Sequence, residues 1–339
     1  MNYFLSILDC YKKSNLIKTI IKIAATILVF TLLFRQISFY DLASKVCQVD
    51  FGLLFTCITS LFLLNLSITI RWRIILRHFG ANKPIASLWR FTLIGAFFNQ
   101  FLPTGMGGDL FRIGYVHASG VPLLTAAASV VVDRIIGFLS LFIVLTIGAP
   151  YLLAIAQSGS VLTTLLILVC LMAAVISVFI RFDQISRALS KIPFLSKWVY
   201  SLGHFARLHE RIEQCAADTR SLLRNWPDGF IVLLISLVNQ TILGLVVFLL
   251  TRAMGYHLDL FAAVVVFPFV LLLSMIPISL AGWGLREGAM VVVFALLGMP
   301  REIALGVSIL FGICLFLSSL PGACLWLVGH RYVTAKVGS

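Results

Sequence analysis

Two charged residues stand next to each other inside an apolar segment of the sequence. Asp133 and Arg134 occur about ten residues into the segment 123–148. A charge near the centre of a membrane-spanning helix costs on the order of 2.5–3.5 kcal/mol on insertion scales, so such residues usually face a bundle interior or a polar cavity. Adjacent helical residues point about 100° apart, so these two need not pair with each other. They are candidates for binding a polar group inside a membrane, and an ion pair that only joins helices is the alternative.

Two glycine-rich stretches elsewhere in the chain interrupt apolar segments. In both, a proline is followed by clustered glycines and then by an acid and an arginine. Residues 103–112 read PTGMGGDLFR and residues 277–287 read PISLAGWGLRE. Proline removes a backbone donor and glycine weakens helices, so both interruptions are predicted to be the unwound tips of broken helices. The residues expected to break the helices are Pro103, Gly105, Gly107, Gly108, Pro277, Gly282 and Gly284.

Charged residues follow each tip. A helix that begins near Asp109 or near Glu287 would direct the positive end of its dipole toward the tip, beside Arg112 or Arg286. We expect Asp133 to pair with Arg112 or Arg286. We expect Arg134 to pair with Asp109 or Glu287. The sequence thus predicts a site for a lipid phosphate; close helix packing at the glycines, with purely structural ion pairs, is the alternative. The candidate headgroup-binding residues are Asn99, Gln100, Asp109, Arg112, Asp133, Arg134, Arg286 and Glu287.

The elements that position these residues are apolar helices. Of the 339 residues, 60% are hydrophobic and only 12% are charged, whereas a soluble domain keeps about 25% of its residues charged. Many apolar stretches approach the roughly 20 residues that cross a bilayer. The sequence therefore predicts an all-α polytopic integral membrane protein. Its apolar segments lie near 17–34, 51–70, 85–102, 123–148, 161–180, 229–251, 261–281 and 303–328, with shorter runs at 109–121 and 288–299.

Basic residues set the predicted orientation. Lysine and arginine gather before the first apolar segment, in the connection after 51–70 that begins at Arg71, and throughout 181–228. These regions and both termini are predicted to be cytoplasmic by the positive-inside rule. The uncharged stretch 149–160 and the charge-balanced stretch 35–50 are predicted to lie outside.

Counting crossings between these regions leaves two segments that do not cross. Residues 85–122 must enter and leave on the cytoplasmic side, and residues 261–300 must do so on the outer side. The chain is therefore expected to have about six spanning helices and two re-entrant broken-helix hairpins, which is typical of an inverted repeat. It is treated as a single transmembrane domain, 1–339, made of a first half (1–180), a cytoplasmic amphipathic connection (181–228) and a second half (229–339).

The net charge of +13 does not indicate nucleic-acid binding, because the basic residues flank apolar segments. Membrane lipids with anionic or modified headgroups are the expected partners, and anionic lipids are expected to attract 181–228. The small residues of 120–137 would permit a homo-oligomer. Neither the spacing of the seven cysteines nor any motif indicates a metal, a cofactor or a catalytic triad. There is no P-loop, so transport driven by ATP bound to this chain is not expected.

Three motifs together resemble a known family. They are Asn99–Arg112 (NQFLPTGMGGDLFR), Val132–Gly137 (VDRIIG) and Pro277–Gly288 (PISLAGWGLREG). In this order they are similar to the signature of the lysylphosphatidylglycerol synthase transmembrane, or flippase-like, family, and the resemblance spans most of the chain. It implies a protein of the bacterial or archaeal cell membrane that moves or binds lipids. In the synthases a soluble aminoacyl-transferase domain follows this region. The sequence shows no such domain after the last apolar segment, so headgroup lysylation is not expected.

Three functions remain open on these grounds. The first is a lipid translocase that binds a headgroup between the two hairpins. The second is a membrane-embedded headgroup transferase, for which Asp109, Asp133 and Glu287 are the candidate acids. The third is a non-catalytic partner that holds a lipid-modifying enzyme through 181–228. The sequence favours the translocase, and favours a transporter over an enzyme.

Overall fold

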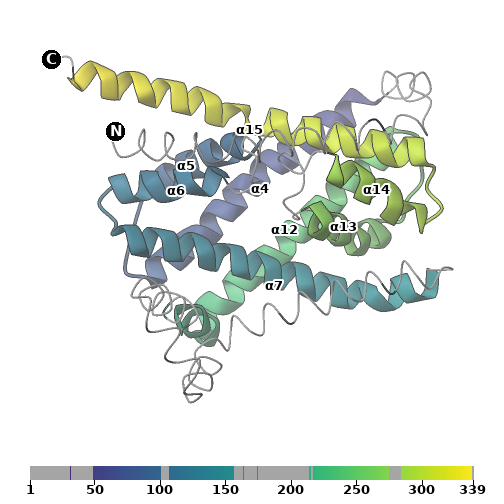
Figure 1. Cartoon of the computed structure of the whole chain (residues 1–339), viewed down its shortest axis with the longest axis horizontal. Helices are drawn as coiled ribbons and strands as arrows, with labels where there is room; N and C mark the ends of the chain where they lie inside the picture. Colours follow the sequence, from purple (N-terminus) through teal and green to yellow (C-terminus); the bar gives the residue numbers. More distant parts are fainter. Residues whose placement is uncertain are drawn as a thin grey trace, which may run out of the picture. The chain divides into compact units, whose positions relative to one another are not determined.

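The computed structural model of this chain is helical wherever it is described (Figure 1). It describes residues 31, 49–100, 107–155, 163, 174, 214, 217–274 and 284–337, and no strand occurs among them. The all-α prediction is therefore confirmed for this part of the chain. Outside the described residues lie nearly all of the predicted spans 17–34 and 161–180, residues 181–213, and both tips, 101–106 and 275–283.

Among the described residues, four helices are long and apolar enough to cross a membrane. They are α4 (Phe51–His78), α7 (Leu123–Ile155), α12 (Trp226–Ala253) and α15 (Arg301–Val337). Large apolar side chains remain exposed on them: Phe55 of α4, for example, is 71% exposed and Leu234 of α12 is 48% exposed. Such surface is unfavourable in water and suits lipid tails. The chain is an all-α, multi-pass membrane protein.

Two pairs of shorter helices occur between the long ones. The first pair is α5 (Ile85–Asn99) and α6 (Gly107–Ala118), and the second is α13 (Leu260–Ser274) and α14 (Leu285–Ala295). At about 1.5 Å per residue each is roughly 17–23 Å long, which is less than the ~30 Å hydrocarbon core. The order long, short, short, long thus occurs twice along the chain. This order matches the two predicted hairpins; their opposite orientation stays a prediction.

The helices contribute to two compact units. Unit 1 takes in the chain up to Phe62, Leu93–Phe111 and the chain from Leu243, and unit 2 takes in Leu63–Thr92 and Arg112–Ile242. The unit boundaries fall inside helices α4, α5, α6 and α12. Each unit contains residues from both sides of the connection 181–228.

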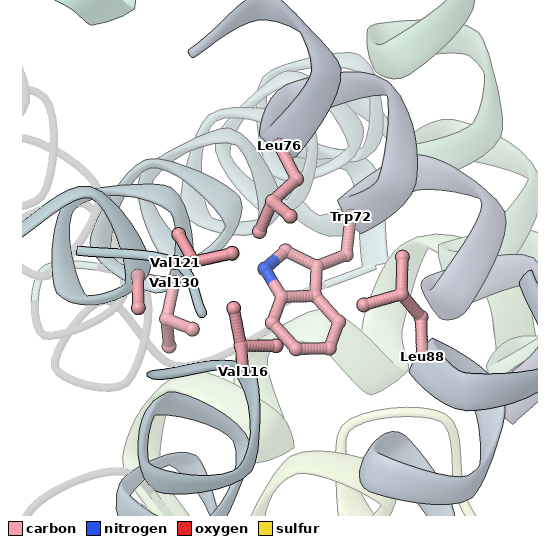
Figure 2. Close-up of a cluster of buried hydrophobic side chains, with 7 residues drawn as sticks. Trp72, Leu76, Leu88, Val116, Val121 and Val130 are labelled. Atoms are coloured by element: carbon pink, nitrogen blue, oxygen red, sulfur yellow. The ribbon is translucent and has the colours of Figure 1, made fainter. Parts of the chain in front are cut away.

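Unit 2 has an apolar core around a tryptophan (Figure 2). The ring of Trp72 is fully buried among side chains that include Leu76, Leu88 and Val116. Its indole nitrogen donates a hydrogen bond to the hydroxyl of Ser129 at 3.1 Å. A buried indole needs such a partner, so this bond fixes the orientation of the ring. The ring is one wall of the charged site described below.

Unit 1 is held by close helix approaches at small residues. In Figure 1, α13 and α14 (green) lie beside α15 (yellow), and α14 packs against both of the other two. A Cβ on Gly322 of α15 would lie 2.1 Å from the carbonyl oxygen of Leu93, and a Cβ on Gly244 of α12 would lie 2.5 Å from the Cα of Val264. Only glycine fits at such approaches, which are typical of helix packing in membranes.

Candidate functional site

The first short pair forms a hairpin whose two outer ends lie together. Lys83, just before α5, donates from Nζ to the carbonyl oxygen of Ser119, just after α6, at 2.5 Å. Further along, the rings of Phe91 and Tyr115 stack with centroids 5.2 Å apart. These contacts make α5 and α6 antiparallel; entry and exit on the cytoplasmic side of a membrane stay a prediction.

The start of α6 is capped by a side chain of α5. The backbone N–H of Gly108 donates to Oδ1 of Asn99 at 2.7 Å. A Cβ on Gly108 would lie 1.9 Å from the carbonyl oxygen of Gly95, so only glycine fits here. Asn99, expected to bind a headgroup, therefore satisfies a backbone donor that the first turn of a helix leaves unpaired.

Unit 2 contains a buried cluster of charged side chains. Arg71 of α4 donates from Nε to Oδ1 of Asp133 of α7 at 2.7 Å. Arg112 of α6 donates to the other carboxylate oxygen, Oδ2, from Nη2 at 3.2 Å and from Nη1 at 3.3 Å. All three residues are buried: Arg71 is 7% exposed, Asp133 is 1% exposed and Arg112 is 4% exposed. We call these three residues the arginine–aspartate cluster. The Asp133–Arg112 pair is one of the two pairings expected from the sequence.

Arg71 also reaches a fourth helix. Its Nη1 donates to the hydroxyl of Ser236 of α12 at 2.9 Å. Its hydrogen bonds use Nε and Nη1, so the two N–H donors of Nη2 have no hydrogen-bond partner in the part of the chain that the structure describes. Gly137 lies next to this end of the side chain, since a Cβ there would be 3.8 Å from Nη1 and 3.9 Å from Nη2. One edge of a buried guanidinium group is thus held beside a residue without a side chain.

The second arginine of the cluster lies against an aromatic face. The Cζ atom of Arg112 is 4.1 Å from the ring centroid of Trp72. Cation–π contact of this kind contributes about 2 kcal/mol or more when it is shielded from water. The contact holds the guanidinium plane while its edge engages Asp133. The arrangement can bind a planar or tetrahedral oxyanion, because guanidinium groups recognise such groups through paired N–H donors.

Arg71 was not among the site residues predicted from the sequence. The predicted end of the span at residue 70 is wrong, because α4 continues to His78; the cytoplasmic side of this end of the helix stays a prediction. Arg71 lies inside this helix and is buried, and 62 residues of sequence separate it from its carboxylate partner, Asp133. No proline or glycine interrupts 53–78, and that unbroken run was the available signal that the helix extends past the arginine.

Unit 1 contains a second buried charge pair. At the start of α14, Oε2 of Glu287 accepts a hydrogen bond from the backbone N–H of Gly284 at 2.5 Å. Its other carboxylate oxygen, Oε1, accepts one from Nη2 of Arg286 at 2.6 Å. The hydroxyl of Ser308 on α15 contacts both Oε1 of Glu287 and Nε of Arg286 at 3.4 Å. Glu287 is fully buried. Both of its oxygens therefore stabilise the helix start and the contact with α15.

Helices α6 and α14 begin where the sequence predicted. Helix α6 begins at Gly107 and α14 at Leu285, each within two residues of the expected acid. Asp109 is 7% exposed in the first turn of α6. Gln100 is partly buried after α5, and Arg134 is partly buried in α7. Pro103, Gly105, Pro277 and Gly282, all expected to break helices, lie outside the described residues.

Comparisons with known proteins identify the relatives of this chain. Residues 19–322 match the family described as the lysylphosphatidylglycerol synthase TM region. A UPF0104 membrane protein of Methanocaldococcus jannaschii is 22% identical over 290 residues, covering 81% of this chain and 84% of the relative. Two UPF0104 membrane proteins of Methanothermobacter thermautotrophicus are 22% and 23% identical over 262 residues, each covering 71% of this chain and 74% or 73% of the relative.

Proposed function

Because the chain belongs to the lysylphosphatidylglycerol synthase TM region family, we propose that it binds the phosphate of a lipid headgroup within the membrane and moves that lipid between leaflets. The family is named for a lipid-related synthase, and the chain is a multi-pass membrane protein. The phosphate-binding residues are Arg71 and Arg112, oriented by Asp133. The proposal thus adds Arg71 to the residues expected from the sequence.

One observation carries the proposal: the edge of a buried guanidinium group without a partner. The Nη2 donors of Arg71 have no hydrogen-bond partner among the described residues, although the side chain is only 8% exposed. This edge of the side chain keeps some exposure, so a ligand can reach it, and a charged donor left unmet inside a membrane is unfavourable. A ligand oxygen with negative charge would accept hydrogen bonds from these donors. A phosphodiester supplies such oxygens in the geometry that arginine prefers.

The remaining members of the site have separate tasks. Asp133 binds both arginines and so reduces the cost of holding them inside the membrane. Trp72 supports Arg112 from its face. Gly137 leaves room beside Arg71, where a larger side chain would compete with a ligand. The hairpin α5–α6 carries Arg112 on its second helix, so movement of this hairpin would carry one of the two phosphate ligands with it.

Scrambling of labelled lipids in liposomes tests the proposal. The purified protein is reconstituted with phospholipids labelled on an acyl chain beside unaltered anionic or zwitterionic headgroups, and an added membrane-impermeant reductant reports the label that reaches the outer leaflet. Arg71→Gln is expected to reduce the rate of anionic lipid exchange at least about tenfold, since it removes a charge-assisted hydrogen-bond donor worth ~1.5–3 kcal/mol. The matched control is Arg77→Gln, which changes an exposed side chain about 1.7 turns further along α4 and is expected to exchange lipid at the wild-type rate.

Other outcomes would separate the alternative functions. Full-rate exchange by a folded Arg71→Gln protein would exclude the proposed site. Chemical conversion of the headgroup, detected by mass spectrometry of the recovered lipid, would instead favour the transferase. Retention of a lipid-modifying enzyme that depends on 181–228, without exchange or conversion, would favour the non-catalytic partner.

A further inference from the structure

An apolar layer adjoins the arginine–aspartate cluster within unit 2. Ile75 is about one turn further along α4 than Arg71. On α12, the carbonyl oxygen of Val232 accepts a hydrogen bond from the hydroxyl of Ser236 at 2.7 Å. Both steps lead from the charged site toward the predicted cytoplasmic ends of these helices. The fully buried members of the layer are Ile75, Val132, Ile136, Leu222 and Val232.

One member of this layer does not come from a membrane-spanning helix. Leu222 belongs to the helical residues 217–224, at the end of the connection 181–228 that is predicted to be cytoplasmic. The other four members come from α4, α7 and α12. We call 217–224 the docked segment. Burial of its leucine among apolar groups is a main favourable term for so short a segment.

The docked segment returns onto α12 through a tight turn. The backbone N–H of Gly229 donates to the carbonyl oxygen of Asn225 at 2.9 Å. A Cβ on Gly229 would lie 2.6 Å from the carbonyl oxygen of Leu222 and 2.9 Å from the Cα of Leu223. A methyl group does not fit at such distances, so the return of the segment onto α12 depends on this glycine.

The docked segment has a buried face and an open one. Thr219 and Leu222, three residues apart, are fully buried, whereas Ser221 between them is exposed. Burial also raises the pKa of the Asp218 carboxyl, an effect that His78 opposes. The ionised carboxyl therefore opposes docking near pH 7, which brings the docked and released arrangements closer in free energy. Lids over ligand sites come from segments of such low local stability.

We propose that the docked segment is a lid that closes the arginine–aspartate cluster toward the cytoplasm, with Leu222 as its plug. With Leu222 in place, apolar side chains of three helices complete the layer, and a charged headgroup would cross it at a high desolvation cost. Release of the segment uncovers Ile75 and Val232, which lie next to Arg71 and Ser236. The connection thus controls access of lipid headgroups from that leaflet. The inference rests on the proposed function and on the predicted orientation.

Accessibility of a buried position tests the lid without requiring lipid movement. Ile75→Cys is placed in the full chain on a cysteine-free background, and a membrane-impermeant thiol reagent is applied to inside-out vesicles. Leu222→Ala and Gly229→Ala are each expected to raise the labelling rate at least about tenfold, because a cavity or a backbone clash weakens docking. Leu234→Ala is the matched control, since it truncates a leucine that is 48% exposed on α12. It should label at the rate of the reporter alone.

A reversible cross-link tests the connection between the lid and lipid exchange. Leu222→Cys and Ile75→Cys are joined in detergent by a short bifunctional methanethiosulfonate, and exchange of labelled anionic lipid is then measured in liposomes. The cross-link holds the segment docked, so exchange is expected to fall at least about tenfold and to return after reduction with dithiothreitol. Each single-cysteine protein, treated with the same reagent, is the control and should keep its rate.

The other outcomes decide separately on the lid and on the proposed function. Labelling that stays at the control rate in both Leu222→Ala and Gly229→Ala would overturn the lid. So would failure of the two cysteines to cross-link, or full-rate exchange by the cross-linked protein. Labelling that accelerates only from the outer side would overturn its cytoplasmic direction. Accelerated labelling in a protein that moves no lipid would support the lid and overturn the proposed function alone.

Discussion

Nε of Arg71 lies 2.7 Å from Oδ1 of Asp133, although 62 residues separate them in the sequence. The two side chains are 8% and 2% exposed. The pair joins α4 to α7, and Ser236 extends it to α12. A buried ion pair of this kind contributes little net stability compared with apolar packing, but loss of one partner is costly because the other is left charged and buried. This asymmetry makes the pair testable.

Removing the carboxylate charge should destabilise the protein. Asp133→Asn leaves Arg71 and Arg112 without their shared carboxylate, so we expect the free energy of unfolding to fall by about 3–5 kcal/mol. Asp228→Asn is the matched control, because its partner Arg77 has a 61% exposed side chain, and exposed pairs contribute only about 0–1 kcal/mol. Denaturant unfolding in detergent micelles measures both. Equal losses for the two variants would show that burial of the Asp133 pair has no special cost.

The close approach at the tip of the first hairpin predicts a contrast between two glycines. Gly108→Ala places a methyl group 1.9 Å from the backbone oxygen of Gly95, whereas Gly137→Ala places one 3.8 Å from its nearest neighbour atom. We expect Gly108→Ala to lose about 1–3 kcal/mol or more through overpacking, and Gly137→Ala to remain close to wild type in thermal stability. A Gly108→Ala protein as stable as the Gly137→Ala protein would contradict this helix packing.

The start of α14 depends on a backbone conformation that favours glycine. Gly284 has φ of 86° and donates its N–H to Glu287. Gly284→Ala should therefore cost about 1–3 kcal/mol in backbone strain. Glu287→Ala should cost more, because it also leaves the Arg286 guanidinium without its carboxylate. Ser308→Ala removes only 3.4 Å contacts and is the mild control. Thermal unfolding that ranks Ser308→Ala as the most harmful of the three would refute this account.

One carboxyl outside the spanning helices predicts a pH dependence. Burial raises the pKa of Asp218 above its ordinary value of 3.8, and the nearby His78 opposes that change. The folded state thus favours the protonated form, so the contribution to stability is present below pH 3.8 and is lost as the pH rises through the folded pKa. Asp218→Asn stays neutral and should melt at a higher temperature than wild type at pH 7, with the gap closing toward pH 4. A constant gap across this range would count against the raised pKa.

The predicted orientation of the two hairpins can be tested with single cysteines in a cysteine-free background. Ala118, His257 and Pro300 are exposed at the outer ends of short helices or in the adjoining turns. A membrane-impermeant thiol reagent applied to intact cells should label His257→Cys and Pro300→Cys. It should label Ala118→Cys only in inside-out vesicles. Labelling of all three from one side would exclude the inverted repeat.

Much of the helical framework follows from local sequence. Apolar runs of about 20 residues specify the long helices, because a bilayer leaves backbone groups no partner outside the helix. The start of α6 near Asp109 and of α14 near Glu287 was predictable for a similar reason, since proline and clustered glycines interrupt a helix locally. The buried character of Asp133 was also readable, because a charge inside an apolar segment must avoid lipid.

The partners of these residues depend on tertiary structure. Sequence placed Arg71 at a cytoplasmic flank, because an arginine near the end of an apolar run usually marks an interface. Packing of α4, α6, α7 and α12 buries it with Asp133, Arg112 and Ser236, which the sequence did not indicate. Likewise, only the packed structure shows that Asn99 and Glu287 are bound to backbone N–H groups at helix starts, while Asn239 and Gln240 keep unmet polar atoms. Hydropathy and charge are properties of the local sequence and can be read from it. Hydrogen-bond partners come from distant parts of the chain and come together only after the helices pack.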